Sequence, residues 1–140
     1  MRVLIIGLGN FGKVLATELT DMGHDVIGID HNELRVEELK DRISLSYILD
    51  ASEVLSLKSL PLDEIDCAVV TIGQSMDYSL RAVSALKRLN VKRIYARAID
   101  DTHRSILGAM GITYIFIPEV YAARVYAHNL NDNRLSDLLM

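Results

Sequence analysis

The chain has 140 residues, of which 50% are hydrophobic and 24% charged, with a formal net charge of −4. This length suits a single domain with its own core. The negative charge gives no electrostatic basis for nucleic-acid binding. No apolar run approaches the roughly 20 residues that a membrane helix needs, so we expect no direct membrane insertion. A lone cysteine, Cys67, suits a reducing compartment, where we expect it to be a small buried apolar residue.

The first part of the chain carries its strongest signal. Residues 2–6 are a short apolar run of strand type, which we expect to begin the mature protein without a signal peptide. A glycine turn follows at once. The turn consists of Gly7, Leu8, Gly9, Asn10, Phe11 and Gly12. Apolar residues then recur at helical spacing, and a second strand over 26–29 ends on Asp30. This succession is the dinucleotide-binding fingerprint.

Each glycine of the turn has a predicted task. Gly7 allows the sharp exit from the strand, Gly9 has no Cβ to hold a pyrophosphate away, and Gly12 lets the helix approach the sheet. The first N–H groups of the helix then face the phosphates. Asp30 can accept hydrogen bonds from an adenosine ribose. The alternative, a turn that binds nothing, leaves Gly9 without a purpose.

The alternation of strands and helices continues along the chain. We expect Asn32 to cap a helix that ends near Leu39, and residues 45–49 to form a short strand. A turn of Asp50, Ala51 and Ser52 follows, with Ser52 placed to cap a short helix. Residues 67–72 form a continuous apolar run, which is typical of a parallel strand buried on both faces.

The second half repeats the same pattern. After Gly73 we expect a helix over 76–89, a strand over 93–98, a helix capped by Asp101 and a strand over 114–117. Pro118 then suits the first turn of a final helix. The sequence therefore predicts an α/β fold with a Rossmann-like, doubly wound, parallel six-stranded sheet in the order 3-2-1-4-5-6.

Ligands of such sheets bind at the carboxyl ends of the strands, where the strand order reverses. The residues that end the strands are therefore our candidates for the site. They are Gly7, Asp30, Asp50, Thr71 with Gly73, Arg97 and Glu119. The four histidines show no metal-ligand spacing, and we expect all of them at the surface or at helix ends.

The final helix is apolar almost all round, since Arg124 is its only charged residue over two turns, 120–127. A helix of this kind is usually buried on all sides. We expect one face to pack on its own sheet and the other on a second subunit. The sequence thus predicts a terminal dimerisation helix.

The order and spacing of these motifs resemble the RCK domains, also called KTN or TrkA-N domains. They are nucleotide-binding regulatory domains of Trk/Ktr-type potassium uptake systems and of ligand-gated potassium channels. The resemblance covers residues 1–131 and leaves 132–140 as a short C-terminal tail. It implies a cytoplasmic subunit, peripheral to the inner face of the membrane, that binds NAD(H) or ATP, ADP or AMP. Such subunits form homodimers and rings that control a membrane-embedded potassium-translocating partner.

The resemblance also implies roles for single residues. The turn from Gly7 to Gly12 would hold the phosphates and Asp30 the ribose. Asp50 and Ala51 would border the adenine, and Thr71, Ile72 and Gly73 would form the far wall of the cleft. Arg97 would contact the phosphates, and Glu119 would help hold the cation that some members bind beside the phosphates.

The sequence departs from the family pattern at two positions. Asn10 replaces an arginine that reaches a phosphate in many ATP-responsive members, which favours NAD(H) slightly over ATP. Leu49 stands where a glycine often precedes the turn at Asp50. Because His31 and Asn32 follow Asp30 and no arginine comes close behind, we also expect NADP⁺ to bind more weakly than NAD⁺.

Three functions remain open from the sequence. The first is a regulatory subunit of potassium transport, and the second is a nucleotide sensor for a non-potassium partner. The third is a small NAD-dependent oxidoreductase, which would need an acid or base near the nicotinamide. Tyr78 has no lysine four residues on, as short-chain reductases require, so we expect no enzymatic activity. The chain is either a lone regulatory domain or a fragment of a longer protein.

Overall fold

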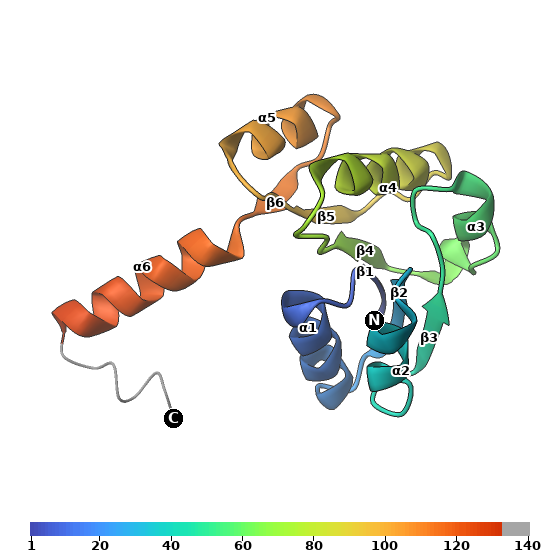
Figure 1. Cartoon of the computed structure of the whole chain (residues 1–140), viewed down its shortest axis with the longest axis horizontal. Coiled ribbons are helices and arrows are strands. Elements are labelled where there is room, and N and C mark those ends of the chain that lie inside the picture. Colours follow the sequence, from blue (N-terminus) through green and yellow to red (C-terminus); the bar gives the residue numbers. More distant parts are fainter. Residues whose placement is uncertain (133–140) are drawn as a thin grey trace.

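The computed structural model describes residues 1–132. A six-stranded, all-parallel sheet runs through the fold in the order β3-β2-β1-β4-β5-β6, which confirms the predicted topology (Figure 1). The strands are β1 (Arg2–Ile6), β2 (Asp25–Asp30), β3 (Leu45–Ile48), β4 (Cys67–Val70), β5 (Ile94–Arg97) and β6 (Tyr114–Phe116). The predicted tail overlaps this range only at residue 132, and the rest of it lies outside the described residues.

Helices cover both faces of the sheet. Helices α1 and α2 lie on one face, and α3, α4 and α5 lie on the other (Figure 1). The helices are α1 (Asn10–Asp21), α2 (Glu33–Leu39), α3 (Val54–Lys58), α4 (Met76–Arg88), α5 (Asp101–Ala109) and α6 (Pro118–Asn131), with a short 3₁₀ helix η1 (Leu62–Glu64). The fold is therefore doubly wound, as the sequence predicted.

Two hydrophobic cores follow from the alternation of side chains along the strands. Leu4 and Ile6 of β1 pack into the core beneath α4, whereas Val3 and Ile5 pack beneath α1 and α2. Both faces of the central strands are buried, which explains their uninterrupted apolar sequences. Cys67 is one of these buried apolar residues, as expected.

Two of the predicted helix caps were wrong. Ser52 does not cap α3, because its hydroxyl bonds the Asp50 carboxylate and the helix begins after Glu53. The cap of α5 is Asp100 rather than Asp101, and its carboxylate accepts from the N–H of His103 at 2.8 Å. In both places neighbouring polar residues competed for the same role.

The four histidines lie at the surface or at helix ends, as expected, and His103 differs from the others in its burial. His103 does lie in the first turn of α5, but its side chain is fully buried. Its Nδ1 accepts the N–H of Ile99 at 2.9 Å, so Nε2 carries the proton that reaches Ser79 Oγ at 3.1 Å. The ring therefore ties α5 to α4 in its neutral form. Loss of water lowers the pKa of His103 below its ordinary value of 6.5.

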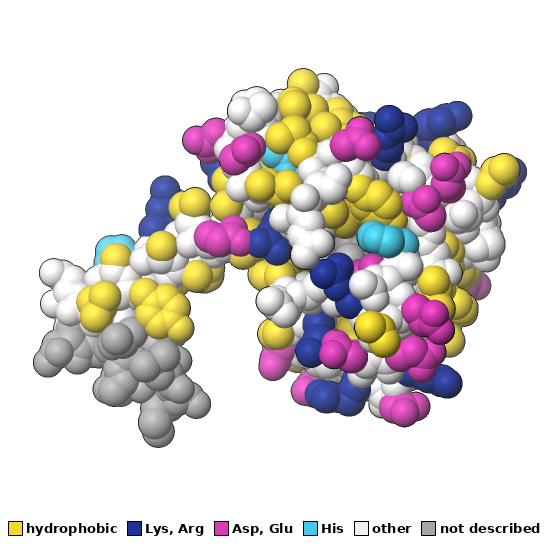
Figure 2. Space-filling view, viewed as in Figure 1, with side chains coloured by type: hydrophobic (Ala, Val, Ile, Leu, Met, Phe, Trp, Pro, Cys, Tyr) yellow, Lys and Arg dark blue, Asp and Glu magenta, His cyan; other side chains and the backbone are white. Residues whose placement is uncertain are grey.

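Helix α6 extends away from the body (Figure 1) and none of its residues is buried. The expectation that one of its faces packs on its own sheet was therefore wrong. Hydrophobic side chains lie on its surface (Figure 2), and Tyr121 is 74% exposed. Among residues 1–132, no helix combines the length and the apolar character needed to cross a bilayer.

We predict that mild acid weakens the fold through His103. The unfolded side chain titrates near 6.5 and the buried one at a lower pKa, so the unfolded state binds more protons between these values. The free energy of unfolding should hold above the unfolded pKa and fall as pH drops through the folded pKa. Urea denaturation over this range measures the effect. His103→Gln should flatten the pH dependence, whereas His128→Gln, at an exposed position, should retain it. An equally flat profile in the parent protein would contradict the prediction.

Candidate functional site

The glycine turn lies where three strands end together. Ile6 of β1 pairs with Ile29 of β2 and with Val70 of β4, so the residues after them meet at one edge of the sheet. Gly7 has a φ of +105°, a conformation that suits glycine. Its N–H donates to the Ile29 carbonyl at 2.9 Å. The sharp exit predicted at Gly7 is confirmed.

Gly12 fixes how closely α1 approaches this turn. A Cβ at this position would lie 1.9 Å from the carbonyl oxygen of Gly7 and 2.6 Å from Oγ1 of Thr71. The single proton of that hydroxyl is shared between the Gly7 carbonyl, at 2.6 Å, and the Ile6 carbonyl, at 3.1 Å. The predicted tight packing at Gly12 is therefore confirmed, and Thr71 holds the carbonyl against which the helix rests.

Close packing does not explain the lack of a side chain at Gly9. A Cβ here would meet no atom nearer than 3.9 Å, and the backbone has an ordinary negative φ of −71°. The fold itself would therefore tolerate a side chain at this position. The space beside Gly9 belongs to an open cleft, and α1 begins directly after it with N–H groups that have no partner within the helix.

The cleft has a volume of about 1290 Å³. It brings together twelve of the fourteen predicted site residues, and Gly12 and Asp50 are the two that do not line it. The lining residues among the candidates are Gly7, Leu8, Gly9, Asn10, Phe11, Asp30, Ala51, Thr71, Ile72, Gly73, Arg97 and Glu119. The strand ends thus meet at one cavity. It lies where the strand order reverses, which is the usual ligand site of such sheets.

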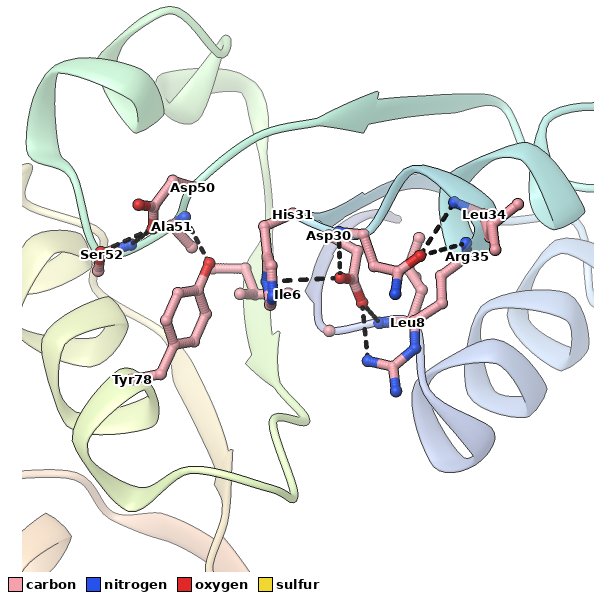
Figure 3. Close-up of polar contacts among 12 residues, drawn as sticks. Ile6, Leu8, Asp30, His31, Leu34, Arg35, Asp50, Ala51, Ser52 and Tyr78 are labelled. Atoms are coloured by element: carbon pink, nitrogen blue, oxygen red, sulfur yellow. Dashed lines mark hydrogen bonds and ion pairs between the residues drawn. The ribbon is translucent and has the colours of Figure 1, made fainter.

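Asp30 is buried at the floor of this cleft (Figure 3). Its Oδ2 accepts the N–H of Leu8 at 2.8 Å, and its Oδ1 accepts the N–H of Asn32 at 2.9 Å. These bonds tie β2 to the glycine turn. An ionised carboxylate can accept about four hydrogen bonds, so it retains capacity for further donors.

Arg35 reaches the same carboxylate from the first turn of α2 (Figure 3). Its NH1 lies 3.6 Å from Asp30 Oδ2, and its guanidinium carbon would lie 3.9 Å from a Cβ on Gly9. The expectation that no arginine comes close to Asp30 was therefore wrong. The prediction that NADP⁺ binds more weakly than NAD⁺ rested on that expectation, so it loses its premise.

The wall next to β3 is built around Tyr78 of α4. Its hydroxyl oxygen accepts the N–H of Ala51 at 2.9 Å, and its ring lies 5.2 Å from that of His31 (Figure 3). Burial raises the pKa of Tyr78 to about 12, so the hydroxyl keeps its proton. Asp50 is held outside the cleft by Ser52, whose hydroxyl lowers the pKa of the carboxyl.

The opposite wall carries an ion pair between β5 and α6. Arg97 donates from NH2 to Oε1 of Glu119, and its guanidinium lies 5.8 Å from the centre of the Phe11 ring. A Cβ on Gly73 would approach this guanidinium to 2.9 Å, so the glycine leaves room for it. The buried Nε of Arg97 has no hydrogen-bond partner among the described residues.

A comparison with protein families matches residues 3–118 to the TrkA-N domain. The match covers most of the chain. The chain belongs to the TrkA-N family. The TrkA-N domain is 33% identical, over 135 residues, to Ktr system potassium uptake protein C of Bacillus subtilis (strain 168). That alignment covers 96% of this chain and 61% of the relative, so the chain spans about three fifths of that protein's length.

Solved structures share the fold of this TrkA-N domain. The TrkA-N domain of inner membrane protein ybaL from Escherichia coli superposes with a TM-score of 0.80 at 22% identity, covering 92% of this chain and 96% of that one. A GsuK channel bound to NAD gives a TM-score of 0.72 at 15% identity, covering 84% of this chain and 21% of that one. These likenesses show the fold.

Sequence reasoning missed several residues that line the TrkA-N cleft, among them His31, Arg35 and Tyr78. Arg35 was detectable, because a residue in the first turn after a strand-end acid lies near that acid. The meeting of Tyr78 with Ala51 joins residues far apart in the chain, and no local pattern predicts it. Among residues 1–132, no cluster of three or more His, Cys, Asp or Glu could hold a metal ion.

Proposed function

We propose that the cleft binds an adenine nucleotide and that this binding regulates a partner in potassium transport. The observation that carries the proposal is the bare position of Gly9. The fold has room for a side chain there, yet the residue is the one whose Cβ would block a pyrophosphate. The start of α1 offers N–H groups and the positive end of its dipole to the same space.

The proposed roles follow the walls of the cleft. The turn from Gly7 to Gly12 holds the phosphates, and Asp30 accepts the ribose hydroxyls beside its bonds to Leu8 and Asn32. The adenine lies toward Ala51, with Leu49 and Tyr78 beside it, and Asp50 contributes by holding this turn rather than by contact. Thr71, Ile72 and Gly73 form the far wall.

Arg97 and Glu119 complete the proposed phosphate side. They are paired with each other in the structure, so a nucleotide phosphate would compete with Glu119 for the guanidinium. The freed carboxylate could then hold a cation beside the phosphates. We propose NAD(H), ATP, ADP or AMP as the ligand. A structural neighbour, a GsuK channel, is described as bound to NAD, which supports this class.

Family membership and the Bacillus subtilis relative support the potassium assignment. We propose that the chain acts as a cytoplasmic regulatory subunit, peripheral to the inner face of the membrane, and that its partner is a membrane-embedded potassium-translocating subunit. A sensor for a non-potassium partner would use the same cleft. An oxidoreductase would need an acid–base pair, and position 82, four residues after Tyr78, is an alanine.

We further propose that α6 pairs with α6 of a second copy, in a homodimer or a larger ring. Large apolar side chains are exposed along this helix, including Tyr121, Tyr126 and Leu130. Burying each of them is worth about 1.5–3 kcal/mol, so a partner surface would stabilise the assembly by several kcal/mol. A symmetric pairing of identical helices is the commonest solution.

The nucleotide proposal predicts that Gly9→Val keeps the fold and loses the ligand. Calorimetric titration of the parent protein with NAD⁺, NADH, ATP, ADP and AMP should detect binding, and Gly9→Val should abolish it because the side chain fills the pyrophosphate position. Its melting temperature should stay near that of the parent. Gly12→Val is the contrasting variant, since its side chain would clash with the Gly7 carbonyl. This substitution should lower the free energy of unfolding by about 3 kcal/mol or more.

Two outcomes would contradict this proposal. One is a parent protein that binds none of these nucleotides. The other is a folded Gly9→Val variant that binds them as tightly as the parent. Incubation with NADH and simple carbonyl compounds should leave the nicotinamide absorbance unchanged. A sustained, catalysed loss of that absorbance would favour the oxidoreductase instead.

The dimer proposal predicts a solution mass of at least twice that of one chain. Tyr121→Asp should shift the protein toward monomer without unfolding it, because the side chain is 74% exposed within one chain and would be buried only against a partner. Leu55→Asp is the matched control, since Leu55 is 81% exposed on α3. Analytical ultracentrifugation distinguishes the variants. A parent that stays monomeric at high micromolar concentration, or an equal response to both substitutions, would contradict the proposed interface.

A further inference from the structure

Arg35 lines the cleft beside Gly9 of the glycine turn. The side chain starts on α2 and brings its guanidinium toward Asp30 (Figure 3). The same guanidinium lies beside Gly9. It is 32% exposed, so it is partly sheltered and still accessible to a ligand. The guanidinium therefore shares the space through which a phosphate chain would pass.

The ion pair between Arg35 and Asp30 is an interaction that a ligand could replace. Asp30 already accepts two backbone N–H groups at 2.8 and 2.9 Å, whereas Arg35 stays at 3.6 Å. A separation of this length, with one partner partly exposed, makes a weak ion pair. The burial of the carboxylate is thus compensated by its backbone bonds, and Arg35 is free to change partner.

We infer that Arg35 pairs with a 5′-phosphate of the bound nucleotide, as the ribose hydroxyls take its place on Asp30. This inference rests on the proposed nucleotide site. A guanidinium presents two parallel N–H donors that match two oxygens of a phosphate. It stands on the α2 side of the turn, across from Arg97, so the phosphates would lie between two arginines.

Among the charged side chains on this side of the turn, Arg35 is the one whose head group lies beside Gly9. Lys13 also lines the cleft, but its ammonium pairs with Glu38 at 3.3 Å. Asn10, at the first position of α1, carries no charge. Lys13 of α1 and Arg35 of α2 thus both bring positive charge to the cleft, and the guanidinium of Arg35 lies beside Gly9.

Calorimetry with adenosine, AMP, ADP, NAD⁺ and NADP⁺ tests this role in the parent, Arg35→Ala and Arg35→Lys proteins. We expect Arg35→Ala to weaken AMP, ADP and NAD⁺ binding by about tenfold while adenosine changes by less than about twofold, because adenosine has no phosphate to lose. Arg35→Lys should restore part of the loss. Added salt should weaken ADP binding less in Arg35→Ala than in the parent.

The matched control is Arg81→Ala. Arg81 pairs with Asp77 on the exposed surface of α4 and should leave every affinity unchanged. Melting temperatures show that each variant is folded. If Arg35→Ala weakened adenosine as much as ADP, Arg35 would act by orienting Asp30, and the inference would be overturned. Unchanged ADP affinity would also overturn it, as would a loss confined to NADP⁺, which would place the guanidinium on a 2′-phosphate. A parent that bound no nucleotide would remove the proposed function as well.

Discussion

The approach of α1 to the carbonyl of Gly7 is the contact on which the rest of the site depends. Because Gly12 has no Cβ, the helix can start directly above the ends of β1 and β4. Thr71 fixes the Gly7 carbonyl from the side, and Asp30 fixes the N–H of Leu8. The turn is thus held by its neighbours before any ligand arrives, so little ordering remains to be done on binding.

The features that point to function are those that the fold does not need for itself. Gly9 has no side chain although one would fit, and Arg35 lies against a carboxylate that already accepts two backbone N–H groups. Within the described residues 1–132, no residue of α6 is buried, although the helix is rich in apolar side chains. The ion pair between Arg97 and Glu119 connects the cleft with α6, because it joins the end of β5 to the first turn of that helix. In the proposed function, a phosphate that bound Arg97 would compete with Glu119 and so loosen the link between the cleft and α6.

The sequence predicted the parts of this structure that local patterns determine. The apolar run of β4, the sharp exit at Gly7 and the cap at Asn32 all follow from neighbouring residues. The alternation of strands and helices predicted the sheet order and, with it, the edge where the cleft opens. What it missed depends on contacts between distant segments. Examples are Tyr78 against Ala51 and the burial of His103 beneath α4. The face of α6 expected on the sheet was wrong because an apolar composition indicates burial without indicating the partner.

Backbone amide chemical shifts during a titration of the parent protein with ADP test the central claim most directly. The account predicts the largest changes at Gly9, Asn10 and Phe11, whose N–H groups face the phosphates, with smaller ones at Ala51 and none at Leu107 in the core beneath α5. Shifts that spared the glycine turn, or an unchanged spectrum at millimolar ADP, would contradict it.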